Sequence, residues 1–292
     1  MSTDPWAQSY PAPAKLNLFL HVVGRKPSGH HLLQTVFRLI DKADRLRFVP
    51  RADGQVRLVC DIPELQSGDD LCVRAARRLK EAAAHPGGVD IHLEKHIPMG
   101  GGLGGGSSDA ATVLRVLNRL WALDLPDSRL AALALGLGAD VPFFLGAGNA
   151  FAEGIGEILT PLTLPAAWYL VLVPPVAVPT AVVFAAPELT RNTKTTTISS
   201  FSAGPGDYRS GYGHNDLEPV ACSRYPQVAA CVDWLRTQQP DARMSGSGAC
   251  VFAEFAAEQE ARSAASRMPA GMRGFVARGL ARHPLQDMLD RG

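Results

Sequence analysis

Apolar and polar residues alternate along residues 14–23, AKLNLFLHVV, near the start of the chain. Because successive side chains of an extended chain point to opposite sides, four aliphatic residues share one face: Leu16, Leu18, Leu20 and Val22. The opposite face carries Lys15, Asn17, Phe19 and His21. The alternation predicts a β-strand with one buried face.

Similar patterns predict further elements in the first half of the chain. Strands are expected at residues 32–40, 44–50, 56–60 and 89–97. Residues 69–85 have apolar side chains at helical spacing, namely Leu71, Ala75, Leu79 and Ala82. A longer helical stripe runs from Ala110 to Trp121, and residues 127–144 contain another helix and its exit.

The second half begins with an apolar run at residues 168–187 that is long enough to suggest a membrane span. Pro174, Pro175 and Pro179 interrupt it, so we predict two short buried strands around a proline corner. Residues 186–214 are rich in Thr, Ser, Gly and Pro and are expected to form a mobile loop. The remaining patterns predict helices at 225–238 and 257–268, and strands at 242–255 and 271–280.

Strands and helices mix without a regular β–α–β alternation, so the predicted fold class is α+β. A chain of 292 residues is long for a single hydrophobic core. We therefore expect two domains, at residues 1–160 and 161–292.

Charge and cysteine content narrow the classes of function. The chain has 29 basic and 28 acidic residues, so no broad positive field attracts nucleic acid. Its five cysteines lack C-x-x-C spacing, which argues against a zinc site or a disulfide framework and favours a reducing cytoplasm. The first ten residues have neither the basic nor the apolar region of a signal peptide, and no membrane partner is expected. No oligomeric state is predicted.

Six glycines fall within residues 100–106, GGGLGGG, immediately before the stripe that begins at Ala110. Such a loop lets backbone N–H groups converge on an anion, and the following helix adds unpaired donors. We expect the helix to begin near Ser107 or Ser108, whose hydroxyls can cap it or bind a phosphate oxygen. A flexible connection with a capped helix is the alternative, but it leaves the entropy cost of six glycines unexplained.

Two other nucleotide motifs fit the glycine run less well. The run matches G-x-G-x-x-G, but a dinucleotide-binding fold also needs an acidic residue at the end of a second strand about 20 positions on. Asp124 follows a helical pattern instead. The Walker pattern is absent because no lysine follows the glycines. A second small-residue segment, MSGSGACVF at 244–252, is by itself typical of an ordinary tight turn, and beside a phosphate loop it is expected to pack against that loop.

The loop PMGGGLGGGSSDAA resembles the phosphate-binding loop of the galactokinase, homoserine kinase, mevalonate kinase and phosphomevalonate kinase superfamily. Residues 11–31, 137–157 and 244–252 resemble, in order, one branch that phosphorylates the 2-hydroxyl of a cytidine-diphosphate alcohol in non-mevalonate isoprenoid biosynthesis. The resemblance implies a two-domain small-molecule kinase that uses ATP as its co-substrate. The ATP site that it implies is Pro98, Met99, Gly100, Gly101, Gly102, Leu103, Gly104, Gly105, Gly106, Ser107 and Ser108.

The resemblance also implies a catalytic pair. Local sequence alone leaves Asp140 equally open to a role as a helix N-cap, since Pro142 suits the first turn of a helix. The resemblance favours a catalytic aspartate that accepts the proton of the substrate hydroxyl. It also makes Lys15 the catalytic lysine, although a lysine on the polar face of a strand is usually solvated.

Five further residues are implied to bind the substrate: Asn17, His30, His31, Thr180 and Phe184. His31 aligns with a histidine that recognises the cytosine base, and Phe184 aligns with an aromatic residue that stacks on it. His30 departs from the tyrosine usual at its position and offers less stacking area. Mg²⁺ is expected to enter with ATP through phosphates and water, so no protein metal ligand is assigned. The alternatives left open are another alcohol kinase of the superfamily and a non-catalytic nucleotide or metabolite sensor.

Overall fold

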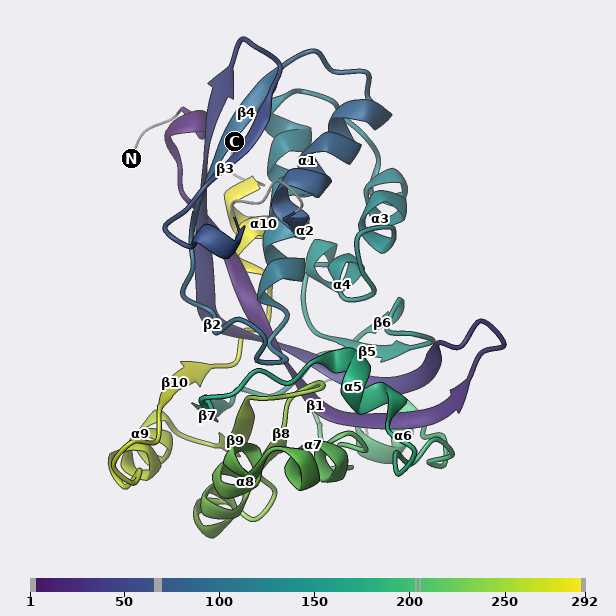
Figure 1. Cartoon of the computed structure of the whole chain (residues 1–292), viewed down its shortest axis with the longest axis vertical. Helices are drawn as coiled ribbons and strands as arrows, with labels where there is room; N and C mark the ends of the chain where they lie inside the picture. The colour runs from purple at the N-terminus through teal and green to yellow at the C-terminus, as the bar shows by residue number, and fades with distance from the viewer. Residues whose placement is uncertain (1–3, 66–69, 203, 205, 290–292) are drawn as a thin grey trace.

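The computed structural model describes residues 4–65, 70–202, 204 and 206–289 of the chain (Figure 1). Its larger sheet has the strand order β3-β4-β2-β5-β6, with β1 paired to β2 off this path. These strands are β1 (Tyr10–Arg25), β2 (His31–Arg51), β3 (Val56–Val59), β4 (Gly88–Glu94), β5 (Ala150–Glu153) and β6 (Ile158–Pro161). Of these pairings, β3 with β4 is parallel and the others are antiparallel. This topology rules out the parallel sheet of a dinucleotide-binding fold.

A smaller antiparallel sheet forms the other end of the molecule, in the order β10-β7-β9-β8. Its strands are β7 (Trp168–Leu172), β8 (Arg243–Met244), β9 (Val251–Phe255) and β10 (Gly274–Arg278). The mixed, largely antiparallel arrangement confirms the α+β fold class.

Helices cover both sheets. Those beside the larger sheet are α1 (Leu71–Ala82), α2 (Gly105–Leu120), α3 (Asp127–Leu135), α4 (Val141–Leu145) and α10 (Pro284–Leu289). The remaining helices are α5 (Thr180–Ala185), α6 (Ile198–Phe201), α7 (Glu218–Arg224), α8 (Pro226–Gln238) and α9 (Glu258–Ser266). Two 3₁₀ turns, Pro5–Ala7 and Pro63–Leu65, complete the described elements.

Strand β1 confirms the first predicted element, but the expectation of a single buried face was wrong. Lys15, Asn17 and His21 are as buried as the aliphatic residues that alternate with them. Elements from both ends of the molecule pack around the strand, so its polar face lines the interior rather than the solvent. Lys15 is therefore not the solvated side chain that lysines in strands usually are.

Three other predictions needed correction. The two strands expected at 32–40 and 44–50 are one continuous strand, β2, because it pairs with β1, β4 and β5 along its length. The second strand of the proline corner is helix α5, which follows Pro179. Helices α7 and α10 were not expected, and the segment at 186–214 contains the short helix α6.

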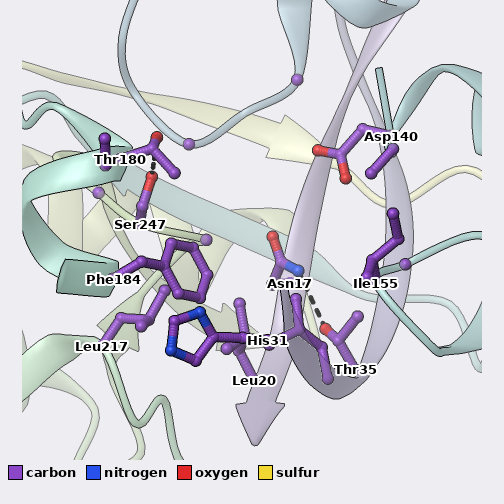
Figure 2. Close-up of a pocket in the computed structure, with 18 of the residues that line it drawn as sticks. Asn17, Leu20, His31, Thr35, Asp140, Ile155, Thr180, Phe184, Leu217 and Ser247 are labelled. Carbon is purple, nitrogen blue, oxygen red and sulfur yellow. Dashed lines mark hydrogen bonds between the residues drawn. The ribbon is translucent and has the colours of Figure 1, made fainter. Parts of the chain in front are cut away.

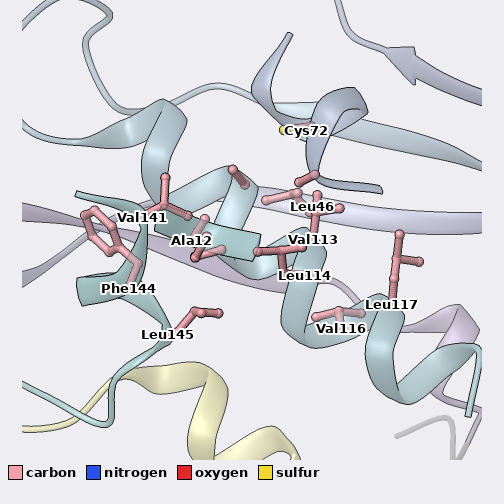
Figure 3. Close-up of a cluster of buried hydrophobic side chains, with 14 of the residues drawn as sticks. Ala12, Leu46, Cys72, Val113, Leu114, Val116, Leu117, Val141, Phe144 and Leu145 are labelled. Atoms are coloured by element: carbon pink, nitrogen blue, oxygen red, sulfur yellow. The ribbon is translucent and has the colours of Figure 1, made fainter. Parts of the chain in front are cut away.

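The largest core cluster joins α1, α2 and α4 to the larger sheet (Figure 3). Helix α2 is the centre of this core, because most of its side chains between Ser108 and Leu117 are buried. Leu285 of α10 belongs to the same cluster, so the last described helix packs against elements from the first half of the chain.

The boundary expected at residue 160 stays a prediction. Among the described residues, no helix is both long and apolar enough to cross a membrane.

His283 generates a prediction about acid stability. It is 1 % exposed, its Nδ1 accepts a hydrogen bond from the Leu285 N–H at 3.2 Å, and burial together with Arg115 lowers its pKa to about 4. Between about pH 6.5 and 4 the unfolded chain binds a proton there that the folded chain does not, so stability is lost as pH falls through this window. We expect His283→Gln to remove up to about 3 kcal/mol of this loss.

The measurement is urea unfolding of the unaltered chain and of His283→Gln at several pH values between 4 and 7. His96→Gln, at an exposed position, is the control. An identical pH slope for the unaltered chain and His283→Gln would contradict the assignment.

Candidate functional site

A cleft of about 660 Å³ lies between the two ends of the molecule (Figure 2). Strands β1 and β2, the glycine loop, the start of α4, helix α5 and the second glycine turn all contribute to its walls. A smaller cavity of about 360 Å³ adjoins it at the glycine loop. Both cavities share Gly100, Gly102, Gly104 and Ser107, so the loop forms the wall between them.

The structure brings the sequence-identified residues together around these cavities. Seven of them line the larger cleft: Lys15, Asn17, His30, His31, Asp140, Thr180 and Phe184. The glycine loop from Pro98 to Ser107 lines the smaller cavity. Ser108 is fully buried, its hydroxyl has no hydrogen-bond partner in the described structure, and it lines neither cavity. Its assignment to the ATP site stays a prediction.

The glycine loop needs its glycines for backbone geometry. Gly100, Gly102 and Gly104 have φ values of 66°, 72° and 72°, in the left-handed region that other residues rarely adopt. Helix α2 begins at Gly105, two residues earlier than expected, and Gly104 takes the N-cap position. No side chain caps this helix, so of the two roles open to the serines the cap is not formed, and the phosphate contact stays a prediction. The first-turn N–H groups are left free to face a ligand.

The second glycine turn packs directly on the loop, as predicted. The N–H groups of Ala249 and Cys250 donate to the carbonyls of Gly100 and Gly101, at 3.2 and 3.1 Å. A Cβ at Gly102 would overlap the carbonyl oxygen of Ser245. Two segments almost 150 residues apart in sequence therefore form one continuous backbone surface.

Lys15 and Asp140 form an ion pair at the centre of the cleft, with 3.4 Å between Nζ and Oδ2. The lysine side chain is 4 % exposed and the aspartate side chain 35 %, so the carboxylate faces the cavity and the ammonium supports it from behind. Asp140 occupies the N-cap position of α4, yet its side chain makes no capping hydrogen bond. The carboxylate is thus available for chemistry rather than used by the helix.

A hydrogen-bond network fixes this pair from β1. The Lys15 ammonium also donates to the Asn17 side-chain oxygen, and the Asn17 amide donates to Thr35 Oγ1 at 3.0 Å. The Lys15 backbone N–H donates to the carbonyl of Leu103 in the glycine loop, at 2.9 Å. Strand β1 and the glycine loop are therefore held in a fixed position relative to each other.

A buried charge cluster lies beneath the loop. Lys95 Nζ bonds to the carboxylates of Asp44 and Asp109, and both aspartates are almost completely buried. Burial raises the pKa of Asp109 to about 8, an effect to which the Asp44 charge adds and which the Lys95 charge opposes. Because Asp44 also accepts from the backbone N–H of Ile97 at 2.8 Å, the cluster ties the start of the loop to β2 and α2.

The opposite end of the cleft carries aromatic rings. His31 and Phe184 reach in from facing walls, with ring centroids 5.0 Å apart and planes inclined at 33° (Figure 2). Because these rings are already in contact, the arrangement leaves no space for a flat ring between them. Exposed His30 lines the cleft nearby and bonds to the Ser28 hydroxyl at 3.1 Å, and its stacking role stays a prediction.

Several residues that line the cleft, or contact a residue that does, had no signal in the sequence. Thr35 lies in the middle of an ordinary strand, and Ser247 bonds to Thr180 at 2.7 Å across two distant segments. Arg191, in the irregular segment after α5, donates to His31 Nε2 at 3.1 Å. Burial, and then the charges of Arg191 and Arg25, lower the pKa of His31. These contacts join segments that are far apart in the sequence, so local periodicity and motifs could not predict them.

Comparison with known proteins assigns both halves to one family. The family described as GHMP kinases N terminal domain matches residues 70–148, and GHMP kinases C terminal matches residues 205–274. The chain is 59% identical over 283 residues to 4-diphosphocytidyl-2-C-methyl-D-erythritol kinase from Thiobacillus denitrificans, which covers 97% of this chain and 99% of the relative.

Solved structures give the same assignment. A crystal structure of 4-(cytidine 5'-diphospho)-2C-methyl-D-erythritol kinase superposes with a TM-score of 0.77 at 37% identity, covering 93% of this chain and 99% of that one. A homoserine kinase from Cytophaga hutchinsonii superposes with a TM-score of 0.71 at 16% identity, covering 98% of each chain, and shares the fold.

The loop geometry predicts the effect of adding one methyl group. A Cβ at Gly104 would lie 2.8 Å from Phe144 Cζ and 3.2 Å from Lys15 Cε, and its φ of 72° disfavours any L-residue. We expect Gly104→Ala to weaken nucleotide binding at least roughly tenfold and to destabilise the fold by about 1–3 kcal/mol. Fluorescent-nucleotide titration and urea unfolding measure the two effects.

Gly138→Ala is the matched control, because its Cβ would meet only Val141 Cγ2, at 3.6 Å. It should keep normal nucleotide affinity. Normal affinity in Gly104→Ala as well would show that the loop does not hold the nucleotide.

Proposed function

The chain belongs to the GHMP kinase family, among the 4-diphosphocytidyl-2-C-methyl-D-erythritol kinases, and we propose that it transfers the γ-phosphoryl group of ATP to the 2-hydroxyl of that alcohol in non-mevalonate isoprenoid biosynthesis. The observation that carries the proposal is the position of the Lys15–Asp140 pair. It lies in one cleft with the glycine loop at one end and the aromatic rings at the other. A triphosphate on the loop and a base on the rings would place the reacting groups beside this pair.

Asp140 is proposed to accept the proton of the attacking hydroxyl. Its carboxylate is the partly exposed member of the pair, and no helix-capping bond competes for it. Phosphoryl transfer depends mainly on positioning and charge stabilisation, with a carboxylate to orient the acceptor hydroxyl and take its proton. Lys15 supplies a fixed positive charge within 3.4 Å, which holds the carboxylate in place and stabilises negative charge on the transferring group.

The glycine loop is proposed to hold the ATP phosphates. Three of its glycines adopt left-handed backbone conformations, and the free N–H groups of the α2 N-terminus follow directly. Ser107 lines both cavities and can donate its hydroxyl to a phosphate oxygen. The smaller cavity, which the loop also lines, offers space for the rest of the nucleotide.

Magnesium is proposed to enter with ATP rather than to occupy a site of its own. Within the described residues, no group of three or more His, Cys, Asp or Glu side chains could hold a metal ion. Among the residues that the structure describes, Asp140 is the carboxylate that lines the larger cleft, and it is paired with Lys15. Mg²⁺ commonly binds through nucleotide phosphates and water, so it does not need a further carboxylate from the larger cleft.

The base-binding role is proposed for His31, Phe184 and His30. Thr180 and Ser247 form a hydroxyl pair on the same wall, suited to the polar groups that link the base to the alcohol. An alcohol lacking the cytidine would leave the aromatic end of the cleft without a partner. This argues against the other superfamily substrates, and the intact Lys15–Asp140 pair argues against a non-catalytic sensor.

The remaining proposals concern partners and location. The partner is a small cytidine-diphosphate molecule, without nucleic acid or membrane, in keeping with the net charge of +1. A cytoplasmic location is proposed because all five cysteines are free thiols, four of them buried.

A substrate panel tests the function. ADP release is measured with ATP, Mg²⁺ and one alcohol at a time: the cytidine-diphosphate alcohol, the same alcohol bearing only a 4-phosphate, mevalonate and homoserine. We expect rapid release with the first alone. Equal or faster release with another alcohol would replace the proposed substrate, and release independent of any alcohol would reject phosphoryl transfer.

Asp140→Asn should lower kcat by about 10²–10⁴-fold while ATP and substrate affinities stay within a few-fold. Asparagine keeps the size of the side chain but cannot accept the proton. Lys15→Ala should cause a comparable loss, and the double variant should be little worse, because residues that act as a unit are not additive. Near-normal kcat in Asp140→Asn would remove the general base from the mechanism.

Phe184→Ala should raise the KM for the cytidine-diphosphate alcohol by roughly 5–100-fold, since stacking on an aromatic side chain contributes about 1–3 kcal/mol per base. The KM for ATP should not change. Val182→Ala, on the same helix but outside the cleft, is the control. A rise in KM of equal size for both variants would point to helix disruption instead of lost stacking.

A further inference from the structure

Arg191 connects His31 and Phe184, the two aromatic residues at the end of the cleft proposed to bind the cytosine. Its Nε donates to His31 Nε2 at 3.1 Å, and its Nη2 donates to the carbonyl of Phe184 at 3.1 Å. Nη2 also donates to the carbonyl of Ala186 at 2.6 Å, and Nη1 donates to that of Leu189 at 3.0 Å. One planar guanidinium therefore joins the start of β2 to the end of α5.

The contact with Arg191 determines which nitrogen of His31 carries the proton. A guanidinium is always protonated and only donates, so His31 Nε2 must accept. In the neutral imidazole the proton then lies on Nδ1, since one ring nitrogen donates when the other accepts. A second proton on Nε2 would point directly at the Arg191 cation, and burial, followed by the charges of Arg191 and Arg25, lowers the pKa of His31.

Nδ1 of His31 is available to a ligand. Within the described part of the chain it makes no hydrogen bond, whereas Nε2 is engaged by Arg191. His31 lines the cleft next to Phe184 (Figure 2). The wall that meets the base therefore presents an N–H donor and not an acceptor.

We propose that Arg191 is a positioning residue for base selection, which fixes His31 with an Nδ1–H donor and holds Phe184 beside it. This inference rests on the proposed function. A donor at this position pairs with cytosine, whose N3 is an acceptor, and is mismatched to uracil, which carries an N–H at N3. The site thereby rejects a uridine-bearing analogue that differs from the substrate only along this edge, because a site built to pair one group is left unsatisfied by the other.

A purely structural role for Arg191 predicts a different result. Arg224 braces the same segment, donating to Glu188 Oε1 at 2.7 and 3.0 Å and to the Val182 carbonyl, but it does not contact His31. Arg224→Met therefore loosens the end of α5 without changing the histidine. It is the matched control for Arg191→Met, which also removes the His31 contact.

The first measurement is ¹⁵N NMR of the histidine side chains in the unaltered chain, with His31→Gln used to assign the signal. We expect the neutral His31 ring to carry its proton on Nδ1. A proton on Nε2 overturns the proposal directly, whether or not any variant folds.

The second measurement compares the unaltered chain, Arg191→Met and Arg224→Met with the cytidine-diphosphate alcohol and its uridine analogue. We expect Arg191→Met to reduce the cytidine-to-uridine ratio of kcat/KM roughly five- to tenfold, mainly through KM, as loss of one hydrogen bond permits. Arg224→Met should keep the ratio of the unaltered chain. An unchanged ratio in Arg191→Met, or an equal fall in both variants, overturns the proposal while leaving the kinase function standing. No phosphorylation of the cytidine-diphosphate alcohol by the unaltered chain overturns both.

Discussion

The close approach of two glycine-rich backbone segments is the constraint on which the rest of the site depends. At Gly102 there is no room for a side chain, because the carbonyl of Ser245 occupies the space that a Cβ would take. Next to this contact, the N–H groups of Ala249 and Cys250 donate to the carbonyls of Gly100 and Gly101. Glycine is required here for close contact as well as for conformation. The two halves of the chain consequently form one continuous backbone surface along a wall of the cleft.

This contact also determines where Lys15 lies relative to the glycine loop. Lys15 is tied to the same loop through its backbone N–H and the Leu103 carbonyl, so the strand that carries the ammonium cannot shift independently of the proposed phosphate site. Ser245 Oγ links the Asn17 N–H to the Gly102 carbonyl, at 3.2 and 3.1 Å, and completes the connection. From beneath, the buried Lys95 cluster holds the start of the loop against β2 and α2. The geometry of Lys15 and Asp140 therefore follows from how tightly the backbones pack.

Local signals in the sequence were sufficient for much of the fold and for the position of the glycine loop. The stripe from Ala110 to Trp121 identified α2, and the glycine run located the loop before it. Alternation identified β1 but not its second buried face, because only tertiary packing shows that Lys15 and Asn17 lie inside the molecule. Family resemblance, rather than pattern, singled out Asp140 and Phe184. Arg191 and Thr35 act through partners distant in sequence, so neither spacing nor periodicity could reveal them.

The central claim is that this single cleft directs phosphoryl transfer to one hydroxyl of a cytidine-diphosphate alcohol. Phosphorus NMR of the chain with ATP, Mg²⁺ and 4-diphosphocytidyl-2-C-methyl-D-erythritol tests it most directly, because the product spectrum reports both transfer and position. The account predicts stoichiometric ADP and one new phosphomonoester on the 2-hydroxyl, with the diphosphate link to cytidine intact. A phosphoryl group on another hydroxyl, cleavage of the diphosphate, or release of inorganic phosphate without a phosphorylated alcohol would contradict it.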